Sequence, residues 1–343
     1  MTTVAVTGGA GYIGAMLVPM LLARGHQIRV LDLFVYGRTA LSPRDGLTLL
    51  DGDVRDPEAV ARCVAGTEAV VHLAAIANDP SCDLAPDLAE STNVAGSRTV
   101  VDAARAAGAR RIVFVSSASV YGIAGGEPVD ETTPTDPITQ YGVTKCRAEE
   151  HLRAVADERF RAVSVRPAAL CGYSPRLRLD LTVNLFTAQA LAAGRVTVFG
   201  GEQRRPVLHV TDAARLCAEL VDRPWPWSGF EAFNAVRDNL TVSEIADRVT
   251  QLVNKRYGDG RAVREFAATP PADRRSYTID ARKVSRMFGF APRLSLEHGV
   301  HDLCDAFDRG LVPDPLVDDR YYNVRRLKRL SDPPPDAAQG TTD

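Results

Sequence analysis

Thr7-Gly8-Gly9-Ala10-Gly11-Tyr12-Ile13-Gly14 follows an apolar run, residues 4–6, and precedes a helix-compatible run, residues 15–23. This order predicts a strand, a glycine turn and a helix. Because glycines have no side chain, they permit a tight turn, let backbone N–H groups approach a pyrophosphate and let the helix pack closely against the strand. The N-terminus of the helix adds free N–H donors and the positive end of its dipole. The cofactor contacts predicted in this turn are Gly8, Gly11, Tyr12, Ile13 and Gly14.

A second predicted strand, residues 27–31, ends in Asp32. Its distance from the glycines is close to that expected in a dinucleotide-binding fold. A carboxylate at this position accepts hydrogen bonds from the adenosine ribose hydroxyls of NAD and repels the 2′-phosphate of NADP. The alternative is that the glycines only make a tight turn and that Asp32 only caps a loop. The match between the motif and its context favours NAD as cofactor.

The composition bounds the class of protein. The chain has 343 residues, enough for one large domain or two modest domains. Hydrophobic residues make up 45% and charged residues 24%, and the net charge of −2 gives no electrostatic argument for nucleic-acid binding. No apolar run approaches the roughly 20 residues needed to cross a bilayer, and no signal-peptide pattern precedes the first strand. We therefore expect a cytoplasmic protein with neither a nucleic-acid nor a membrane partner.

Cysteine and histidine spacing gives no sign of a metal site. The six cysteines lie far apart and form no C-x-x-C pair, which favours reduced, packed thiols in a cytosolic protein. The six histidines are scattered, and none has a second ligand at metal spacing. We predict no metal.

The first half of the chain alternates predicted strands and helices. Apolar strands between helices are typical of a parallel sheet covered on both faces. Asp53 and Val54 follow a short apolar strand, where ligands bind in open α/β sheets. Asp53 could accept a hydrogen bond from an adenine amino group, cap the helix predicted over residues 57–65, or do both. Small residues after the next strand let a cofactor lie against the backbone, and the predicted contacts there are Leu73, Ala74 and Ala75.

A third group of residues carries the predicted chemistry. Ser117 follows the apolar strand 111–115, and a helix is predicted to begin near Tyr141. Tyr141 and Lys145 are four residues apart and share one face of that helix. An ammonium group beside a phenol favours the phenolate, so we expect a lowered pKa that makes Tyr141 a proton acceptor near neutral pH. Taken alone, Y-x-x-x-K is a frequent accident that a solvated helix face explains better, but the nucleotide turn and the strand-end serine favour the catalytic interpretation.

Five segments together resemble the extended short-chain dehydrogenases/reductases, and more narrowly their NAD-dependent nucleotide-sugar epimerases and dehydratases. They are residues 7–14, 52–54, 72–75, 116–122 and 141–145, and their order and approximate spacing match. The resemblance implies an α/β fold of Rossmann type, with a doubly wound parallel sheet of about seven strands. It implies that Tyr141 is the acid/base, that Lys145 holds the nicotinamide ribose and that Ser117 positions the sugar hydroxyl. Further predicted contacts are Asn93, Ser116 and Pro167 for the cofactor, and Asn78 and Ser119 for the substrate.

The resemblance continues to about residue 310. Asn184 lies in a helix predicted to run to residue 193, and the corresponding segment contacts the nucleotide diphosphate in the family. Arg205 lies in a segment similar to R-D-[FY]-[VIL]-H-V-x-D, with Pro206 in place of the usual acid. It is a candidate diphosphate ligand, because a guanidinium can bond two phosphate oxygens, although a surface arginine is the alternative. Arg275, in a segment that resembles D-x-R-x-Y, is the second candidate.

These segments predict two domains and a tail. We assign residues 1–170 and 207–238 to an NAD-binding domain, and residues 171–206 and 239–312 to a smaller, discontinuous nucleotide-sugar-binding domain. Residues 313–343 form a C-terminal tail. Its basic cluster at 325–329 is predicted to be a solvated helix face, and its last dozen residues to be disordered. In much of the family the helices that begin near Asn93 and Tyr141 form a dimer interface, so we expect a homodimer.

The combined prediction is an NAD-dependent epimerase that acts on a nucleotide-linked hexose. Tyr141 takes the proton of a sugar hydroxyl, with C4 favoured, and the keto-sugar turns over before hydride returns to its opposite face. Ala118 and Ser119 stand where family dehydratases carry an acid, which disfavours dehydration and decarboxylation. The main alternative is a 4-ketoreductase, although Asp32 disfavours NADPH as its reductant. A nucleotide-binding regulator with an idle site is a further alternative, disfavoured by the intact catalytic set.

Overall fold

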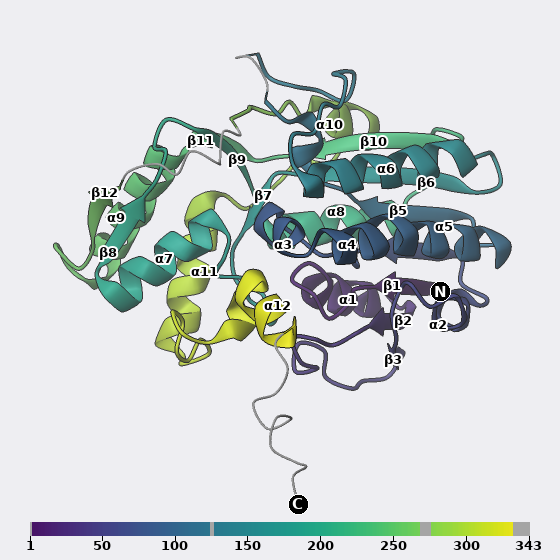
Figure 1. Ribbon diagram of the computed structural model, residues 1–343, viewed down its shortest axis with the longest axis horizontal. Coiled ribbons are helices and arrows are strands. Elements are labelled where there is room, and N and C mark those ends of the chain that lie inside the picture. The colour runs from purple at the N-terminus through teal and green to yellow at the C-terminus, as the bar shows by residue number, and fades with distance from the viewer. Residues whose placement is uncertain (1, 124–126, 268–275, 332–343) are drawn as a thin grey trace, which may run out of the picture.

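The central element is a parallel sheet, which comprises seven strands in the part of the chain that the structure describes (Figure 1). The structure is a computed structural model, and it describes residues 2–123, 127–267 and 276–331. In spatial order the strands are β10 (Phe230–Ala235), β6 (Arg161–Pro167), β5 (Arg111–Val115), β4 (Ala69–His72), β1 (Thr3–Thr7), β2 (Gln27–Asp32) and β3 (Leu47–Asp51). This confirms the predicted doubly wound α/β fold.

The strand order places a ligand crevice at β1. From β1 the chain adds β2 and β3 on one side and then β4, β5, β6 and β10 on the other, so the order reverses between β1 and β4. Val4, for example, lies beside Ile28 of β2 and Ala69 of β4. In open parallel sheets, ligands bind at the carboxyl ends of the strands at such a reversal. The glycine turn begins at the carboxyl end of β1.

Both faces of the sheet are covered by helices, because its strands are apolar on both sides. On β1, Val4 and Val6 join one buried cluster and Ala5 joins the other, as the alternation of side chains along a strand requires. The first cluster includes residues of α1 (Gly14–Ala23), α8 (Val210–Asp222) and α10 (Arg282–Phe288). The second includes residues of α2 (Pro57–Val64), α5 (Ser97–Ala106) and α6 (Gln140–Val155).

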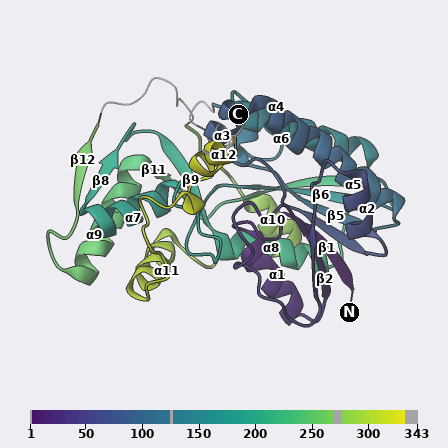
Figure 2. The same ribbon diagram turned by 60° about the horizontal axis from the view of Figure 1, so that its bottom comes forward.

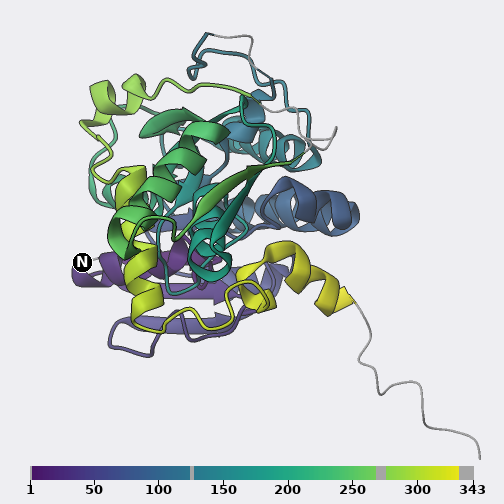
Figure 3. The same ribbon diagram turned by 90° about the vertical axis from the view of Figure 1, so that its left-hand side faces the viewer.

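A smaller lobe lies beyond the carboxyl ends of the strands, and Figure 3 views the molecule from that side. It contains a three-stranded sheet of β7 (Ala169–Cys171), β9 (Arg204–His209) and β11 (Asp238–Thr241), and a parallel pair, β8 (Arg195–Val198) and β12 (Val263–Phe266). Three helices pack on these strands: α7 (Thr182–Ala193), α9 (Val242–Tyr257) and α11 (Leu296–Asp308). The side chain of Thr241 caps α9 in a capping box with Glu244.

The remaining elements lie near the junction of the two lobes. They are α3 (Asp79–Leu84), α4 (Pro86–Ala89), a π-helical segment (Glu90–Gly96), two short 3-10 segments (Ala118–Tyr121 and Asp319–Tyr321) and α12 (Asn323–Ser331). Figures 1 and 2 show α12, in yellow, beside α3 at this junction. All six cysteines are buried free thiols. Within the described residues, no helix is both long and apolar enough to cross a membrane.

Three local predictions are corrected. The side chain that caps α2 belongs to Asp56, which accepts a hydrogen bond from the Glu58 backbone, whereas Asp53 pairs with Arg55. The helix predicted to start near Asn93 begins earlier, as the π-helical segment that runs into α5. The basic cluster at 325–329 is only partly solvated, because α12 packs one side against the protein. The tail beyond residue 331 lies outside the described residues.

Candidate active site

The carboxyl ends of β1, β2, β4, β5 and β6 border a cavity of about 730 Å³ that the smaller lobe closes on its far side. Most of the predicted site residues line it. They are Gly8, Gly11, Tyr12, Ile13, Gly14, Asp32, Asp53, Val54, Leu73, Ala74, Ala75, Asn78, Ser116, Ser117, Ser119, Tyr141, Lys145, Pro167 and Arg205. The structure therefore brings together residues that are up to 197 positions apart in the sequence, Gly8 and Arg205 among them.

The glycine turn fits closely against the sheet. Gly8 has a φ of +72°, and an added Cβ would lie 2.5 Å from the backbone nitrogen of Ala74. A Cβ on Gly14 would lie 2.4 Å from the carbonyl oxygen of Gly9. These contacts bring α1 against the turn, and in the described structure no side chain caps the N-terminus of this helix. The N-terminus of α1 thus faces the cavity with the positive end of its dipole, whereas the N–H groups of Ala15, Met16 and Leu17 already bond carbonyls of Gly11 and Ile13.

Asp32 ends β2 at the same cavity. Its Oδ2 accepts a hydrogen bond of 2.9 Å from the backbone nitrogen of Ala10, and its Oδ1 accepts one of 2.8 Å from that of Phe34. Burial raises the pKa of Asp32, and these two hydrogen bonds oppose the rise. Asp53 is held by Arg55, with Oδ2 accepting 2.9 Å and 2.6 Å bonds from Nε and Nη2. The glycine turn has space near the backbone that any side chain would occupy, and Asp32 is a fixed carboxylate at the end of β2. Both features fit the binding of a dinucleotide.

Ser117, Tyr141 and Lys145 line the opposite part of the cavity. The Oγ of Ser117 accepts a hydrogen bond of 3.1 Å from the Ser119 backbone and donates one of 3.1 Å to the Ser119 hydroxyl. Tyr141 is in the first turn of α6, whose capping residue is Thr139. The Lys145 Nζ lies 5.7 Å from the centroid of the Tyr141 ring. Burial lowers the pKa of Lys145 to about 8.

The expectation of a lowered pKa for Tyr141 is wrong for this structure, which contains the protein alone. Burial raises the pKa of the phenol, and the carboxyl group of Asp79 and the thiol of Cys82, when ionised, raise it further. The charge of Arg178 and a hydrogen bond with Ser117 lower it, but they do not outweigh burial. The prediction considered only the neighbouring ammonium, whereas withdrawal of the phenolate from water has the larger effect here.

Two predicted residues do not line the cavity but hold its walls. Asn184 is fully buried, and its side chain bonds the backbone nitrogen of Gly172, at 2.9 Å, and the hydroxyl of Tyr12, at 3.0 Å. Asn93 bonds both backbone groups of Ile76, at 2.8 Å and 3.0 Å. Arg275 lies outside the described residues.

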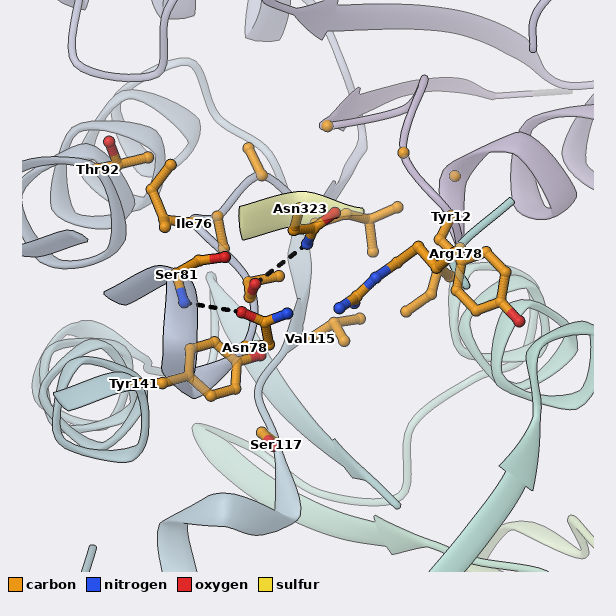
Figure 4. Close-up of a pocket in the computed structure, with 18 of the residues that line it drawn as sticks. Tyr12, Ile76, Asn78, Ser81, Thr92, Val115, Ser117, Tyr141, Arg178 and Asn323 are labelled. Atoms are coloured by element: carbon orange, nitrogen blue, oxygen red, sulfur yellow. Dashed lines mark hydrogen bonds between the residues drawn. The ribbon is translucent and has the colours of Figure 1, made fainter. Parts of the chain in front are cut away.

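The cavity also contains charged and polar residues to which the sequence assigned no role, among them Arg176, Arg178, Asp180 and Asn323. Arg178 pairs with Asp180, with N···O distances of 2.9 Å and 3.0 Å. Figure 4 shows Arg178 and Tyr141 extending into the cavity from opposite sides. The alternation of charged and apolar residues over 176–180 is a signal for the first three. No sequence signal points to Asn323, which lies 143 residues after Asp180.

Comparison with known proteins gives a consistent picture. A family model described as the NAD dependent epimerase/dehydratase family matches residues 4–235. A UDP-glucose 4-epimerase of Azospirillum brasilense is 28% identical over 345 residues, covering 90% of this chain and 92% of that protein. A dTDP-glucose 4,6-dehydratase of Mycolicibacterium smegmatis is 31% identical over 314 residues, covering 88% and 91%.

A solved structure is similar over nearly its whole length. MoeE5, in complex with UDP-glucuronic acid and NAD, has a TM-score of 0.78 and 27% identity, covering 90% of this chain and 99% of that chain. Because epimerases and dehydratases match at similar identity, the comparisons do not separate these two reactions.

Proposed function

The chain belongs to the NAD-dependent epimerase/dehydratase family, and on that premise we propose that it is an epimerase that inverts C4 of a nucleoside-diphosphate hexose. As a member of this family it is an NAD-dependent enzyme of the extended short-chain dehydrogenase/reductase type. The observation that carries the proposal is that Ser117 and Tyr141 line the same cavity as the glycine turn and Asp32. A sugar hydroxyl placed at Tyr141 is therefore adjacent to the dinucleotide site.

The residues have distinct roles in the proposed reaction. Bound NAD, held at the glycine turn and Asp32, would supply the reversible hydride acceptor for the sugar carbon. Tyr141, as phenolate, takes the proton of the C4 hydroxyl, and after the keto-sugar has turned over it gives the proton back. Ser117 hydrogen-bonds the same oxygen. Lys145 is fixed by its bond to the Val115 carbonyl and is placed to hold the nicotinamide ribose.

The smaller lobe supplies the proposed nucleotide contacts. Arg205 lines the cavity from β9, and Arg178 lines it from the segment before α7. Both guanidinium groups match the charge of a diphosphate, and we retain Arg275 as a further candidate. Binding of the nucleotide at this end keeps the keto-sugar in place while it turns, because the remote part of the substrate provides the binding energy.

Dehydration is the alternative that a specific observation favours. Ala118 and Ser119 provide no carboxyl group, but Asp79 is a buried residue of the cavity wall whose charge acts on Tyr141. A carboxyl group beside the sugar can assist elimination of a hydroxyl. We place epimerisation first because Asp79 comes from α3 and not from the segment that carries the acid in family dehydratases. A 4-ketoreductase remains a second alternative.

The test begins with the purified protein and no added cofactor. The protein is denatured, and released nicotinamide nucleotide is quantified by chromatography. Near-stoichiometric NAD or NADH supports a reaction without net redox change, and an empty protein favours the reductase. UDP-, dTDP- and GDP-hexoses are then incubated with the enzyme in D₂O and followed by NMR. A C4 epimer without deuterium at C5 is the expected product, and a 4-keto-6-deoxy sugar would replace the proposal with dehydration.

Three assignments accompany this proposal. We place NAD binding in residues 1–170 with 207–238 and nucleotide-sugar binding in residues 171–206 with 239–312. We propose a homodimer that uses the helices beginning near Asn93 and Tyr141, and size-exclusion chromatography with light scattering tests it. We place the enzyme in the cytoplasm, since six free thiols suit a reducing compartment.

A further inference from the structure

The C-terminal helix α12 contacts both lobes at the mouth of the cavity. Its first residue, Asn323, is 5% exposed, and its Nδ2 donates a hydrogen bond of 3.1 Å to the Ala77 carbonyl oxygen. Figure 4 shows this bond. One turn later, the Nε of Arg326 donates a bond of 2.7 Å to the carbonyl oxygen of Val35, in the loop after Asp32. Leu327 and Leu330 line the cavity itself. The helix therefore forms a wall of the cavity.

Asn323 also connects to the groups that face Tyr141. Its backbone nitrogen donates a hydrogen bond of 3.3 Å to Oδ2 of Asp180. The same carboxylate pairs with Arg178 and accepts a bond of 2.8 Å from Nδ2 of Asn78. Arg178 thus has its position fixed by a carboxylate that Asn323 holds, and its charge lowers the pKa of Tyr141.

The loop that Asn323 holds is under local strain. Asn78 has a φ of +81°, a region that residues with a side chain rarely occupy. Its Oδ1 caps α3 by accepting a bond of 3.0 Å from the Ser81 backbone. Strained conformations persist only where the surrounding structure holds them. Here the carbonyl oxygen of Ala77 accepts a hydrogen bond from α12, and the side-chain amide of Asn78 donates one to Asp180. The strain lies directly beside Asp79, which faces Tyr141 from α3.

A buried arginine depends on the same residue. Arg176 is 6% exposed and stacks over the ring of Tyr36, with 3.6 Å from Cζ to the centroid. Its Nη2 donates a bond of 2.5 Å to Oδ1 of Asn323, whereas Nε and Nη1 have no acceptor among the described residues. Burial lowers the pKa of Arg176 to about 10. Loss of the Asn323 amide would remove an acceptor from a guanidinium that already has too few.

We propose that α12 is part of the active site and that Asn323 is a positioning residue. Asn323 holds the loop before α3 and the Arg178–Asp180 pair, so that Arg178 stays near the phenol of Tyr141. The part that concerns Tyr141 rests on the proposed function. The part that concerns the cavity wall does not, because it follows from the contacts of α12 with the loops at residues 35 and 77. Each part has its own measurement.

The experiment compares Asn323→Ala and Arg326→Ala with Lys328→Ala, whose side chain is exposed on the same helix. The first measurement is release of NAD from the purified holoenzyme during dialysis, which needs no substrate. We expect Asn323→Ala and Arg326→Ala to release NAD at least ~10-fold faster, since each loses one or more buried hydrogen bonds. Lys328→Ala should match the parent. If both Asn323→Ala and Arg326→Ala release NAD at the parental rate, the proposal that α12 forms a wall of the cofactor cavity is refuted.

The second measurement is the pH dependence of kcat with the NDP-hexose that the parent converts. The charged and titratable groups that face Tyr141 are Arg178, Lys145 from α6, and Asp79 and Cys82 from α3. Asn323→Ala keeps the backbone bond to Asp180 but removes the side-chain bonds to Ala77 and Arg176 that fix the start of α12. If the start of α12 shifts, Asp180 no longer fixes Arg178, and less positive charge stabilises the buried phenolate of Tyr141. The rise of kcat with pH should therefore move to higher pH in Asn323→Ala, by about half a unit or more. Arg326→Ala leaves both side-chain bonds of Asn323 in place and should leave the midpoint unchanged.

The outcomes separate the two proposals. A parental pH midpoint in Asn323→Ala would refute the positioning role, whatever its effect on stability. Faster NAD release from Arg326→Ala supports the proposal that α12 is a wall of the cavity. If the midpoint of its kcat–pH profile is parental, loosening α12 does not by itself shift that profile. If the parent converts no NDP-hexose, the proposed function fails, and NAD release still decides whether α12 is a wall of the cavity.

Discussion

The Nζ of Lys145 donates a hydrogen bond of 2.9 Å to the backbone carbonyl oxygen of Val115, so the ammonium group is held at the end of β5. It is almost fully buried, and burial lowers its pKa from 10.5 to about 8. Between these two values the unfolded chain binds more protons than the folded protein. The contribution of Lys145 to the free energy of unfolding of the cofactor-free protein should therefore rise as pH rises from about 8 to 10.5. The six buried thiols, whose pKa burial raises, contribute in the opposite direction.

Lys145→Met tests this relationship. A neutral side chain of similar length removes the buried charge, so the cofactor-free variant should be more stable than the parent at pH 7, by up to about 3 kcal/mol. The difference in stability between the variant and the parent should shrink as pH rises from about 8 to 10.5, because the other titrating groups are common to both proteins. Denaturant unfolding at pH 7, 8.5 and 10 measures both effects. Identical pH dependence in the two proteins would mean that Lys145 is not the group that titrates.

Tyr141→Phe removes one hydroxyl and leaves the ring. Because the phenolate is the proposed acid/base, turnover should fall by about 10²- to 10⁴-fold. The NAD content after purification should stay near the parental value, since the glycine turn and Asp32 are untouched. Stereoisomer formation by NMR and chromatography of released cofactor measure the two quantities. Parental turnover would show that another group transfers the proton.

Gly11→Ala and Gly14→Ala form a matched pair within one turn. A Cβ on Gly11 has Gly8 O, at 3.1 Å, as its near neighbour and otherwise enters the cavity, whereas a Cβ on Gly14 would lie 2.4 Å from Gly9 O. Gly11→Ala should keep the thermal midpoint of the cofactor-free protein but weaken NAD binding at least ~10-fold. Gly14→Ala should lower that midpoint as well, because backbone must move. NAD titration and thermal unfolding separate the two effects.

Arg166 and Glu149 form a buried ion pair that fixes α6 to β6. Nη2 of Arg166 lies 2.5 Å from Oε2 of Glu149, and Nη1 donates a bond of 2.8 Å to the hydroxyl of Tyr121. Arg166→Met leaves the carboxylate buried without its partner and should lower the free energy of unfolding by about 3–5 kcal/mol. The double variant Arg166→Met/Glu149→Leu should recover most of this loss. A double variant as unstable as the single one would contradict this account.

Local sequence was sufficient for the sheet and for the cofactor end of the cavity. The glycine turn, Asp32 and the Tyr141–Lys145 pair are encoded in short segments whose periodicity and spacing can be read directly. Asn323 could not be found in that way, because its position depends on how α12 folds back against the loops after β2 and β4. The alternation over residues 176–180 can be read locally, but only the fold of the smaller lobe brings Arg178 to the cavity. The pKa of Tyr141 was misjudged for a related reason: the depth of its burial depends on α3 and on residues 176–180, which no spacing on α6 reveals.

The place of α12 in the chain also determines when the enzyme can be completed during protein synthesis. Among the described residues, all others that line the cavity precede position 278, whereas α12 begins at 323. The ribosome therefore delivers both sheets, the glycine turn and the catalytic tyrosine before it delivers this wall. A nascent chain that captures its dinucleotide early holds it in a cavity still open to solvent, and the cavity wall is completed only after α12 has been translated.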